Sequence, residues 1–262
     1  MIPLPFRDAT NKAVTFATDK PGGFSDNEIA ILKGIQHALS ATIEARYLRH
    51  LARMLMDTYV GPVAGRRVLQ GQIKRGSGET IRAAIWFSDL KSFTALSERL
   101  PGQALIDTLN AYFDAITPAI KTEGGEVLKF IGDAVLAIFQ PKDEDEEDAV
   151  DRALAASQSA MERLKIENAA RRQSESPEIA CGIALHFGDM IYGNVGGENR
   201  LDFTVIGPAV NLASRIEALT REDDRPVLVS AEFAALHGGA FEDLGIVDLK
   251  GIGQRRVFAP KQ

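Results

Sequence analysis

Two aspartates stand where their carboxylates could share a metal ion. Asp89 ends an apolar run, 81–89, that is typical of a buried strand, and Asp133 lies at the turn between apolar runs 126–131 and 134–139. If this hairpin pairs beside strand 81–89, both carboxylates come to one end of a sheet. Mg²⁺ binds one or two protein carboxylates and completes its coordination with water and substrate phosphate oxygens. Because an aspartate after a strand more often bonds its own backbone, the pair alone indicates nucleotide chemistry only weakly.

The predicted elements around the two aspartates indicate an α/β sandwich. Apolar faces with helical spacing run over 105–120, 150–164 and 208–219. Strand-like runs lie at 81–89, 126–131, 134–139, 178–187, 189–195, 202–206, 226–229, 241–249 and 255–259. The order strand-helix-strand-strand-helix-strand, followed by further strands, is typical of helices that cover a mixed sheet. We therefore expect an α/β (α+β) domain.

The composition is that of a globular protein with a sizeable core. The 262 residues are 45% hydrophobic and 25% charged, with a formal net charge of -6 and one cysteine, Cys181. This length allows one full core plus a partial second unit, or two small domains. The lone cysteine excludes disulfides and cysteine metal sites, and we expect it to be buried. The mild acidic excess argues against a general nucleic-acid surface, so no nucleic-acid partner is expected.

No segment is expected to enter a membrane. The longest apolar runs are much shorter than the ~20 residues that cross a bilayer, and the first residues, MIPLPFRD, lack the features of a secretory signal. We therefore expect a soluble, cytoplasmic protein.

A long helix with leucines at coiled-coil spacing precedes the sandwich. A capping-box pattern at Ser25 predicts that the helix begins there. Leu48, Leu51 and Leu55 could then meet a twin helix of a second chain or pack on the chain's own core, and the sequence leaves both alternatives open. Residues 61–80, which hold five glycines, predict a linker.

The two aspartates lie in the first two of four motifs that follow one another along the chain. The motifs are FSDLKSFT at 87–94, KFIGDAVLAIF at 129–139, LHFGDMIYGNVGG at 185–197 and DFTVIGPAVNLASR at 202–215. Together they resemble the class III adenylate/guanylate cyclase catalytic domain over about residues 80–260, and Thr204 is similar to its bacterial, threonine-containing subgroup. The resemblance implies a ferredoxin-like fold that works as a head-to-tail homodimer. It also implies two catalytic sites at the dimer interface, each with two Mg²⁺ or Mn²⁺ ions.

The N-terminal piece carries a second resemblance. Its sequence PGGFSDNEIAILKGIQHALSATIEA resembles the last strand and helix of a GAF-type sensor domain. We therefore expect three parts: a partial GAF-like strand and signalling helix over 1–60, a linker over 61–80 and the cyclase catalytic domain over 81–262.

The cyclase resemblance assigns the metal ions to the end of the sheet. Asp89 and Asp133 match the two metal-binding aspartates, and the carbonyl group of Leu90 matches a further ligand. Some members of the family also carry a phosphate-binding arginine on the strand before a Gly-Ile dipeptide. Here that strand reads EIACGIAL and has none, so phosphate binding is expected to depend on Lys250, the metal ions and groups that the sequence does not identify.

The remaining matched positions concern the nucleotide. Lys129 and Thr204 match the residues that recognise the purine, and Lys250 matches a lysine that holds the terminal phosphates. Asn211 and Arg215 match the residues that orient the ribose and stabilise the transition state, supplied by the protomer opposite to the metal aspartates. These two lie four residues apart on a predicted helix, so they share one face. A planar guanidinium that stays charged suits negative charge that develops on phosphate oxygens.

The resemblance implies an adenylate cyclase. Such an enzyme converts ATP to 3′,5′-cyclic AMP and pyrophosphate by in-line attack of the ribose 3′-hydroxyl on the α-phosphorus, assisted by two metal ions. A guanylate cyclase is an alternative, and so is a catalytically silent module that binds nucleotide or dimerises. The silent module is disfavoured because Asp89, Asp133, Asn211 and Arg215 are all present. A diguanylate cyclase is disfavoured because the hairpin reads FIGDA instead of GG[DE]EF.

Overall fold

The computed structural model describes residues 1–6, 11–222 and 225–261, which form two compact units. Unit 1 comprises Met1–Leu69 and unit 2 comprises Gln70–Gln262. Each unit is described by itself. Among the described residues, no helix combines the length and the apolarity that crossing a bilayer requires.

Unit 1 is a small antiparallel hairpin with helices. Its elements are β1 (Ile2–Pro5), β2 (Asn11–Val14), α1 (Asp26–Gly34), α2 (Gln36–Tyr59) and α3 (Pro62–Leu69). The capping box predicted at Ser25 is present, because its hydroxyl accepts from the amide of Glu28 while the Glu28 side chain accepts from the amide of Ser25. The single long helix that we predicted is interrupted at Ile35, which caps α1 and precedes α2.

The hairpin of unit 1 is tied to helix α2 by side-chain hydrogen bonds. The amide of Gln36 donates to the carbonyl of Pro3, and the hydroxyl of Ser40 donates to the carbonyl of Pro5. Further along α2, Leu48 is 51% exposed and Leu55 is 47% exposed. The structure therefore leaves two of the three seam leucines open to solvent.

Unit 2 is built on one mixed sheet. Its strands run in the order β4-β5-β3-β6-β8-β10-β9, with β7 paired to β6; β8 pairs with β6 in parallel, and the other described pairs are antiparallel. The strands are β3 (Gly78–Leu90), β4 (Glu126–Ile131), β5 (Ala134–Phe139), β6 (Cys181–Gly196), β7 (Leu201–Ile206), β8 (Val227–Ser230), β9 (Phe241–Leu249) and β10 (Gly253–Pro260). The helices are α4 (Phe93–Arg99), α5 (Gly102–Thr122), α6 (Glu146–Gln173), α7 (Pro208–Leu219) and α8 (Ala231–His237). The predicted α/β fold with a mixed sheet and covering helices is confirmed.

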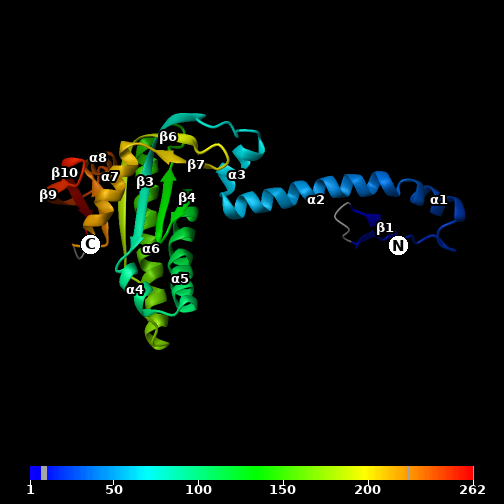
Figure 1. Cartoon of the computed structure of the whole chain (residues 1–262), viewed down its shortest axis with the longest axis horizontal. Helices are drawn as coiled ribbons and strands as arrows, with labels where there is room; N and C mark the ends of the chain where they lie inside the picture. The colour runs from blue at the N-terminus through cyan, green and yellow to red at the C-terminus, as the bar shows by residue number, and fades with distance from the viewer. Residues whose placement is uncertain (7–10, 223–224, 262) are drawn as a thin grey trace. The chain divides into compact units, whose positions relative to one another are not determined.

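Helices cover both faces of this sheet (Figure 1). On β6, Ile183 and Leu185 join a core cluster with α5, α6 and α8, whereas Ala184 joins a second cluster with α7. The alternation follows from the two-residue period of a strand. Cys181 belongs to the first cluster and is buried, as predicted.

The end of β3 is held by a buried polar chain on the α5 face. The indole of Trp86 donates to the hydroxyl of Ser88 over 2.9 Å, and this hydroxyl lies 2.8 Å from that of Tyr112 on α5. Because successive strand residues point to opposite faces, Asp89 points to the face that α7 covers. The packing of β3 thus determines on which face the first metal-ligand candidate lies.

Candidate active site

Asp89 and Asp133 lie together at one end of strand β3. Asp133 stands in the tight turn between β4 and β5, where Gly132 adopts a positive φ of 65°. Strand β5 pairs with β3 so that Ser88 faces Val135, which brings the turn beside the end of β3. The carboxyl groups of the two aspartates are within hydrogen-bonding reach of each other. The pairing that the sequence predicts therefore joins them at one point.

The surroundings of Asp89 disfavour its ionisation. Burial, followed by the hydrogen bond to Asp133 and the charge of that residue, raises the pKa of Asp89 from 3.8 to about 7. Its side chain is 15% exposed, and its Oδ1 accepts from the amide of Leu90 over 3.0 Å. Two carboxylates in this position are costly to ionise together unless a cation joins them.

The donor set fits a magnesium or manganese ion. Carboxylate oxygens are hard ligands, which Mg²⁺ and Mn²⁺ prefer. Within the described parts of the chain, no group of three or more His, Cys, Asp or Glu side chains is placed to hold a metal ion. The protein would therefore offer the metal ions two carboxylates and a backbone carbonyl group. Oxygens of the substrate would supply further ligands.

A guanidinium that the sequence analysis did not identify also reaches this point. Nη2 of Arg221 lies 2.5 Å from Oδ2 of Asp89. Arg221 follows α7, and one turn earlier Glu217 is buried at 2% exposure against the same strands. Burial raises the pKa of Glu217, and Arg221 opposes this shift. No local pattern in the sequence marks Arg221, because 132 positions separate it from its partner.

The predicted purine-recognition residues form a second group. Nζ of Lys129 on β4 lies 2.5 Å from Oδ2 of Asp202 on β7. Thr204 lies two residues after Asp202 on the same strand, so both side chains point to the same face, and Thr204 is 8% exposed. The structure thus brings Lys129 and Thr204 to one locality and adds Asp202, which the motif comparison missed.

The other predicted residues do not reach the aspartates of their own chain. Asn211 and Arg215 are both exposed on α7. At about 100° per residue, Arg215 lies on the opposite side of the helix from Glu217, which faces β3 and Asp89. Lys250 is exposed in the turn between β9 and β10.

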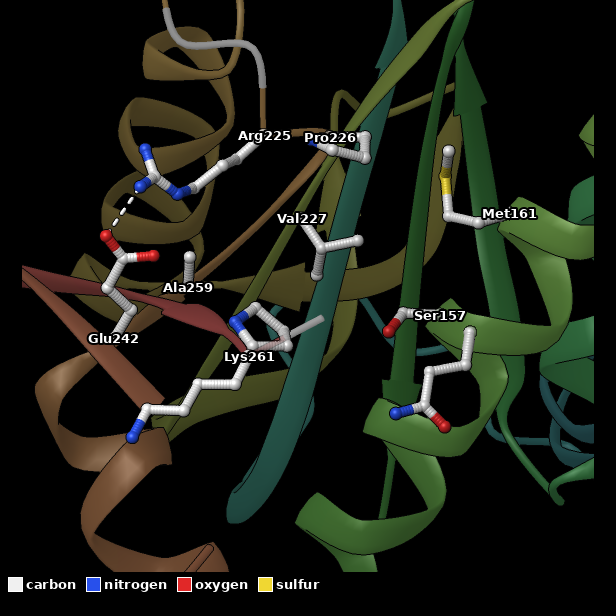
Figure 2. Close-up of a pocket in the computed structure, with 10 residues that line it drawn as sticks. Ser157, Met161, Arg225, Pro226, Val227, Glu242, Ala259 and Lys261 are labelled. Carbon is white, nitrogen blue, oxygen red and sulfur yellow. Dashed lines mark hydrogen bonds and ion pairs between the residues drawn. The ribbon is translucent and has the colours of Figure 1, made fainter. Parts of the chain in front are cut away.

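A groove of about 1000 Å³ lies elsewhere, between α6 and strands β8 to β10 (Figure 2). It is lined by Ser157 and Met161 of α6 and contains the ion pair between Arg225 and Glu242, 2.6 Å apart. None of the predicted site residues lines it. This groove is therefore separate from the residues that the sequence predicts for the site.

A comparison with protein families shows to which family the chain belongs. The profile described as the adenylate and guanylate cyclase catalytic domain matches residues 77–259, which include every predicted site residue. The chain belongs to this family. The class III cyclase resemblance that the sequence motifs carry is thereby confirmed, whereas nothing in the match concerns the GAF-like piece or the threonine subgroup.

Individual relatives of the cyclase domain include both nucleotide specificities. An adenylate cyclase of Anabaena cylindrica is 30% identical over 211 residues, which are 78% of this chain and 41% of the relative. The structure of a bacterial light-regulated adenylyl cyclase is 28% identical with a TM-score of 0.71, covering 85% of this chain and 64% of that one. The structure of the guanylyl cyclase Cya2 is 27% identical with a TM-score of 0.61, covering 70% and 92%.

The matched relatives are nucleotide cyclases by name, and this family acts on nucleotides and generally uses divalent metal ions. Dimers are typical of the family. The chain spans less than half the length of the curated relatives that it matches first, the Anabaena enzyme and adenylate cyclase 1 of Rhizobium meliloti. The base that it prefers and the arrangement of its interface are taken up below.

Proposed function

We propose that the chain is an adenylate cyclase that converts ATP to 3′,5′-cyclic AMP and pyrophosphate. The observation that carries this proposal is the lysine at the base-recognition position. Lys129 is held beside Thr204 by its contact with Asp202. A lysine only donates hydrogen bonds, so it suits the N1 acceptor of adenine and not the N1 donor of guanine.

Thr204 fits either base, because its hydroxyl can accept from the exocyclic amino group of adenine or donate to O6 of guanine. The selectivity for adenine therefore depends on Lys129. A site whose buried polar groups are left unpaired by the wrong base rejects that base strongly. A guanylate cyclase is the second candidate, since the Asp202 carboxylate could accept from the N1–H of guanine; it is disfavoured because the Lys129 ammonium beside this carboxylate would face the same N1 donor.

For the reaction, we assign the carboxylates of Asp89 and Asp133 and the carbonyl of Leu90 as the metal ligands. Bound Mg²⁺ or Mn²⁺ ions would lower the pKa of the ribose 3′-hydroxyl and offset the charge of the triphosphate during in-line attack on the α-phosphorus. Asn211 would orient the ribose, and Arg215 would stabilise charge on the oxygens of the reacting phosphorus. Lys250 would bind the terminal phosphates.

We further propose that two chains complete each site in a head-to-tail homodimer. Asn211 and Arg215 face solvent on the side of α7 away from Asp89, so a single chain offers two half-sites. Apolar side chains near these half-sites are also uncovered: Ile191 and Ile206 are cross-strand partners, 48% and 41% exposed, and Phe130 on β4 is 49% exposed. Exposed apolar clusters of this kind mark protein interfaces.

For the N-terminal part we keep the sequence-based proposal. Residues 1–60 are assigned to the end of a GAF-like sensor domain and a signalling helix, 61–80 to a connection and 81–262 to the catalytic domain. The connection contains helix α3 and the first residues of β3, so it is more ordered than its five glycines suggest.

The test of the proposed function is product identification. The purified protein is incubated with ATP or GTP and either Mn²⁺ or Mg²⁺, and the products are separated by chromatography. The proposal predicts 3′,5′-cyclic AMP and pyrophosphate from ATP. Cyclic GMP as the main product would favour the second candidate, and nucleotide binding without any cyclic product would favour a silent module.

A further inference from the structure

The ion pair between Arg221 and Asp89 occupies a proposed metal ligand. The guanidinium Nη2 and the carboxylate Oδ2 are 2.5 Å apart, and the Asp89 side chain is 15% exposed while that of Arg221 is 53% exposed. Arg221 is therefore anchored at its tip but open to solvent along its length. Such a side chain can change partner without disturbing the core.

The backbone packing under this contact explains why it forms. Gly182 is the cross-strand partner of Asp89 on β6. A Cβ on Gly182 would lie 1.8 Å from Oγ1 of Thr220 and 2.6 Å from Oε1 of Glu217, so only glycine lets the end of α7 approach this closely. Arg221 follows Thr220 directly, and its side chain is thereby delivered to Asp89.

The contact cannot persist once a metal ion takes Oδ2 of Asp89, the oxygen that Arg221 contacts. The ion and the guanidinium would compete for the same carboxylate, and two cations at one oxygen repel each other strongly where the surroundings are partly buried. Arg221 must then find another anion. Its presence on Asp89 also means that a metal ion has to displace it.

Among the described residues, Glu217 is an anion to which the released guanidinium could turn, and the substrate is another. Glu217 lies one turn earlier on the same helix, but its side chain is buried and its Oε1 already accepts from the hydroxyl of Thr220 over 3.4 Å. The substrate triphosphate would lie on the open side, bound to the same metal ions as Asp89. Phosphate oxygens suit the planar fork of an arginine, which can bind them bidentately.

We propose that Arg221 is a triphosphate-binding residue that is held on Asp89 until a metal ion takes this carboxylate. The proposal rests on the proposed role of Asp89 as a metal ligand. Arg221 would give the phosphates a positively charged partner that the sequence motifs do not identify.

The test compares Arg221→Gln with wild type in two calorimetric titrations at pH 8.5. In the first, Mn²⁺ alone is added. The variant is expected to bind Mn²⁺ several-fold more tightly, because no guanidinium competes for Asp89. In the second, pyrophosphate is added at saturating Mn²⁺, and the variant is expected to bind it about tenfold more weakly, since a charge-assisted contact is lost. Arg221→Lys should recover part of the pyrophosphate affinity.

The matched control is Arg225→Gln, which removes another arginine of the same region that pairs with Glu242. It should change neither titration. Mn²⁺ binding that is no tighter in Arg221→Gln would overturn the competition for Asp89, and unchanged pyrophosphate binding would overturn the role of Arg221 in binding the phosphates. If both shifts are observed but wild type makes no cyclic nucleotide, the proposed function fails while the assignment of Arg221 stands.

Discussion

The ammonium group of Lys129 lies 2.5 Å from a carboxylate oxygen of Asp202, although their strands, β4 and β7, are not neighbours in the sheet. The two side chains are 39% and 45% exposed. An exposed pair of this kind contributes only about 0–1 kcal/mol to stability, so it orients the lysine without preventing its transfer to a base. The pair thus keeps the Lys129 ammonium group near Thr204.

The first prediction concerns base selectivity. Wild type should prefer ATP, and Lys129→Glu combined with Thr204→Cys should reduce the use of ATP more than that of GTP, because the donor for N1 becomes an acceptor. The measurement is kcat/KM for both nucleotides. Lys121→Glu, at the exposed end of α5, is a control for the change of charge alone. Wild-type kcat/KM values for ATP and GTP within about threefold of each other, equal to about 0.7 kcal/mol, would contradict the assignment of Lys129 and Thr204 to base recognition.

The second prediction concerns the metal ligands. Asp89→Asn and Asp133→Asn should each abolish nearly all turnover at ordinary Mg²⁺ concentrations, because phosphate charge is then left uncompensated. Circular dichroism should show that both variants are folded. Asp189→Asn removes an exposed carboxylate that pairs with Arg82 and should retain activity. An active Asp89→Asn enzyme would contradict the assignment.

The third prediction follows from the raised pKa of Asp89. An acid whose pKa is higher in the folded state binds its proton more tightly there, so its contribution to stability is present below pH 3.8 and is lost as the pH rises toward about 7. Metal-free Asp89→Asn carries no charge at this position. The difference in Tm between this variant and wild type should therefore shift in favour of the variant as the pH rises from 5 to 8. A shift of one pKa unit corresponds to about 1.4 kcal/mol, so the gain should amount to several degrees. A difference in Tm that is the same at both pH values would contradict the raised pKa of Asp89.

The fourth prediction concerns helix α2. If its exposed leucines, Leu48 and Leu55, pair with those of a second chain, unit 1 raises the local concentration of catalytic halves. Deletion of residues 1–69 should then make specific activity rise steeply with protein concentration, whereas the full chain should show little change. Equal specific activity across dilution in both proteins would show that α2 does not hold the dimer.

Local signals account for the elements that could be predicted from the sequence. The hairpin 126–131 and 134–139 and the helix 208–219 have the predicted bounds, because glycine at the turn and proline at the first helical position mark their ends. The break predicted at Gly188 is wrong. Strand β6 continues through this residue, which pairs with Ala83 of β3, so the long partner strand overrides the local preference of glycine.

Long-range contacts account for what the sequence did not indicate. Asp202 and Arg221 are ordinary surface residues by type, and they become part of the candidate site through partners 73 and 132 positions away. Their placement depends on strand register and on the close approach of α7 to Gly182, neither of which leaves a local pattern. The aspartates could be predicted because each stands at a strand end or turn that the sequence marks.

The shared site is the central claim, and mixing two inactive variants tests it most directly. Asp89→Asn and Arg215→Ala should each be nearly inactive alone, the second by about 10²–10³ in turnover as for the loss of an oxyanion donor. After subunit exchange, half of the dimers carry one variant of each kind, and one of their two sites is intact, so cyclic AMP formation should recover to about a quarter of the wild-type rate. No recovery, with exchange confirmed by differently tagged chains, would contradict a site built from two chains.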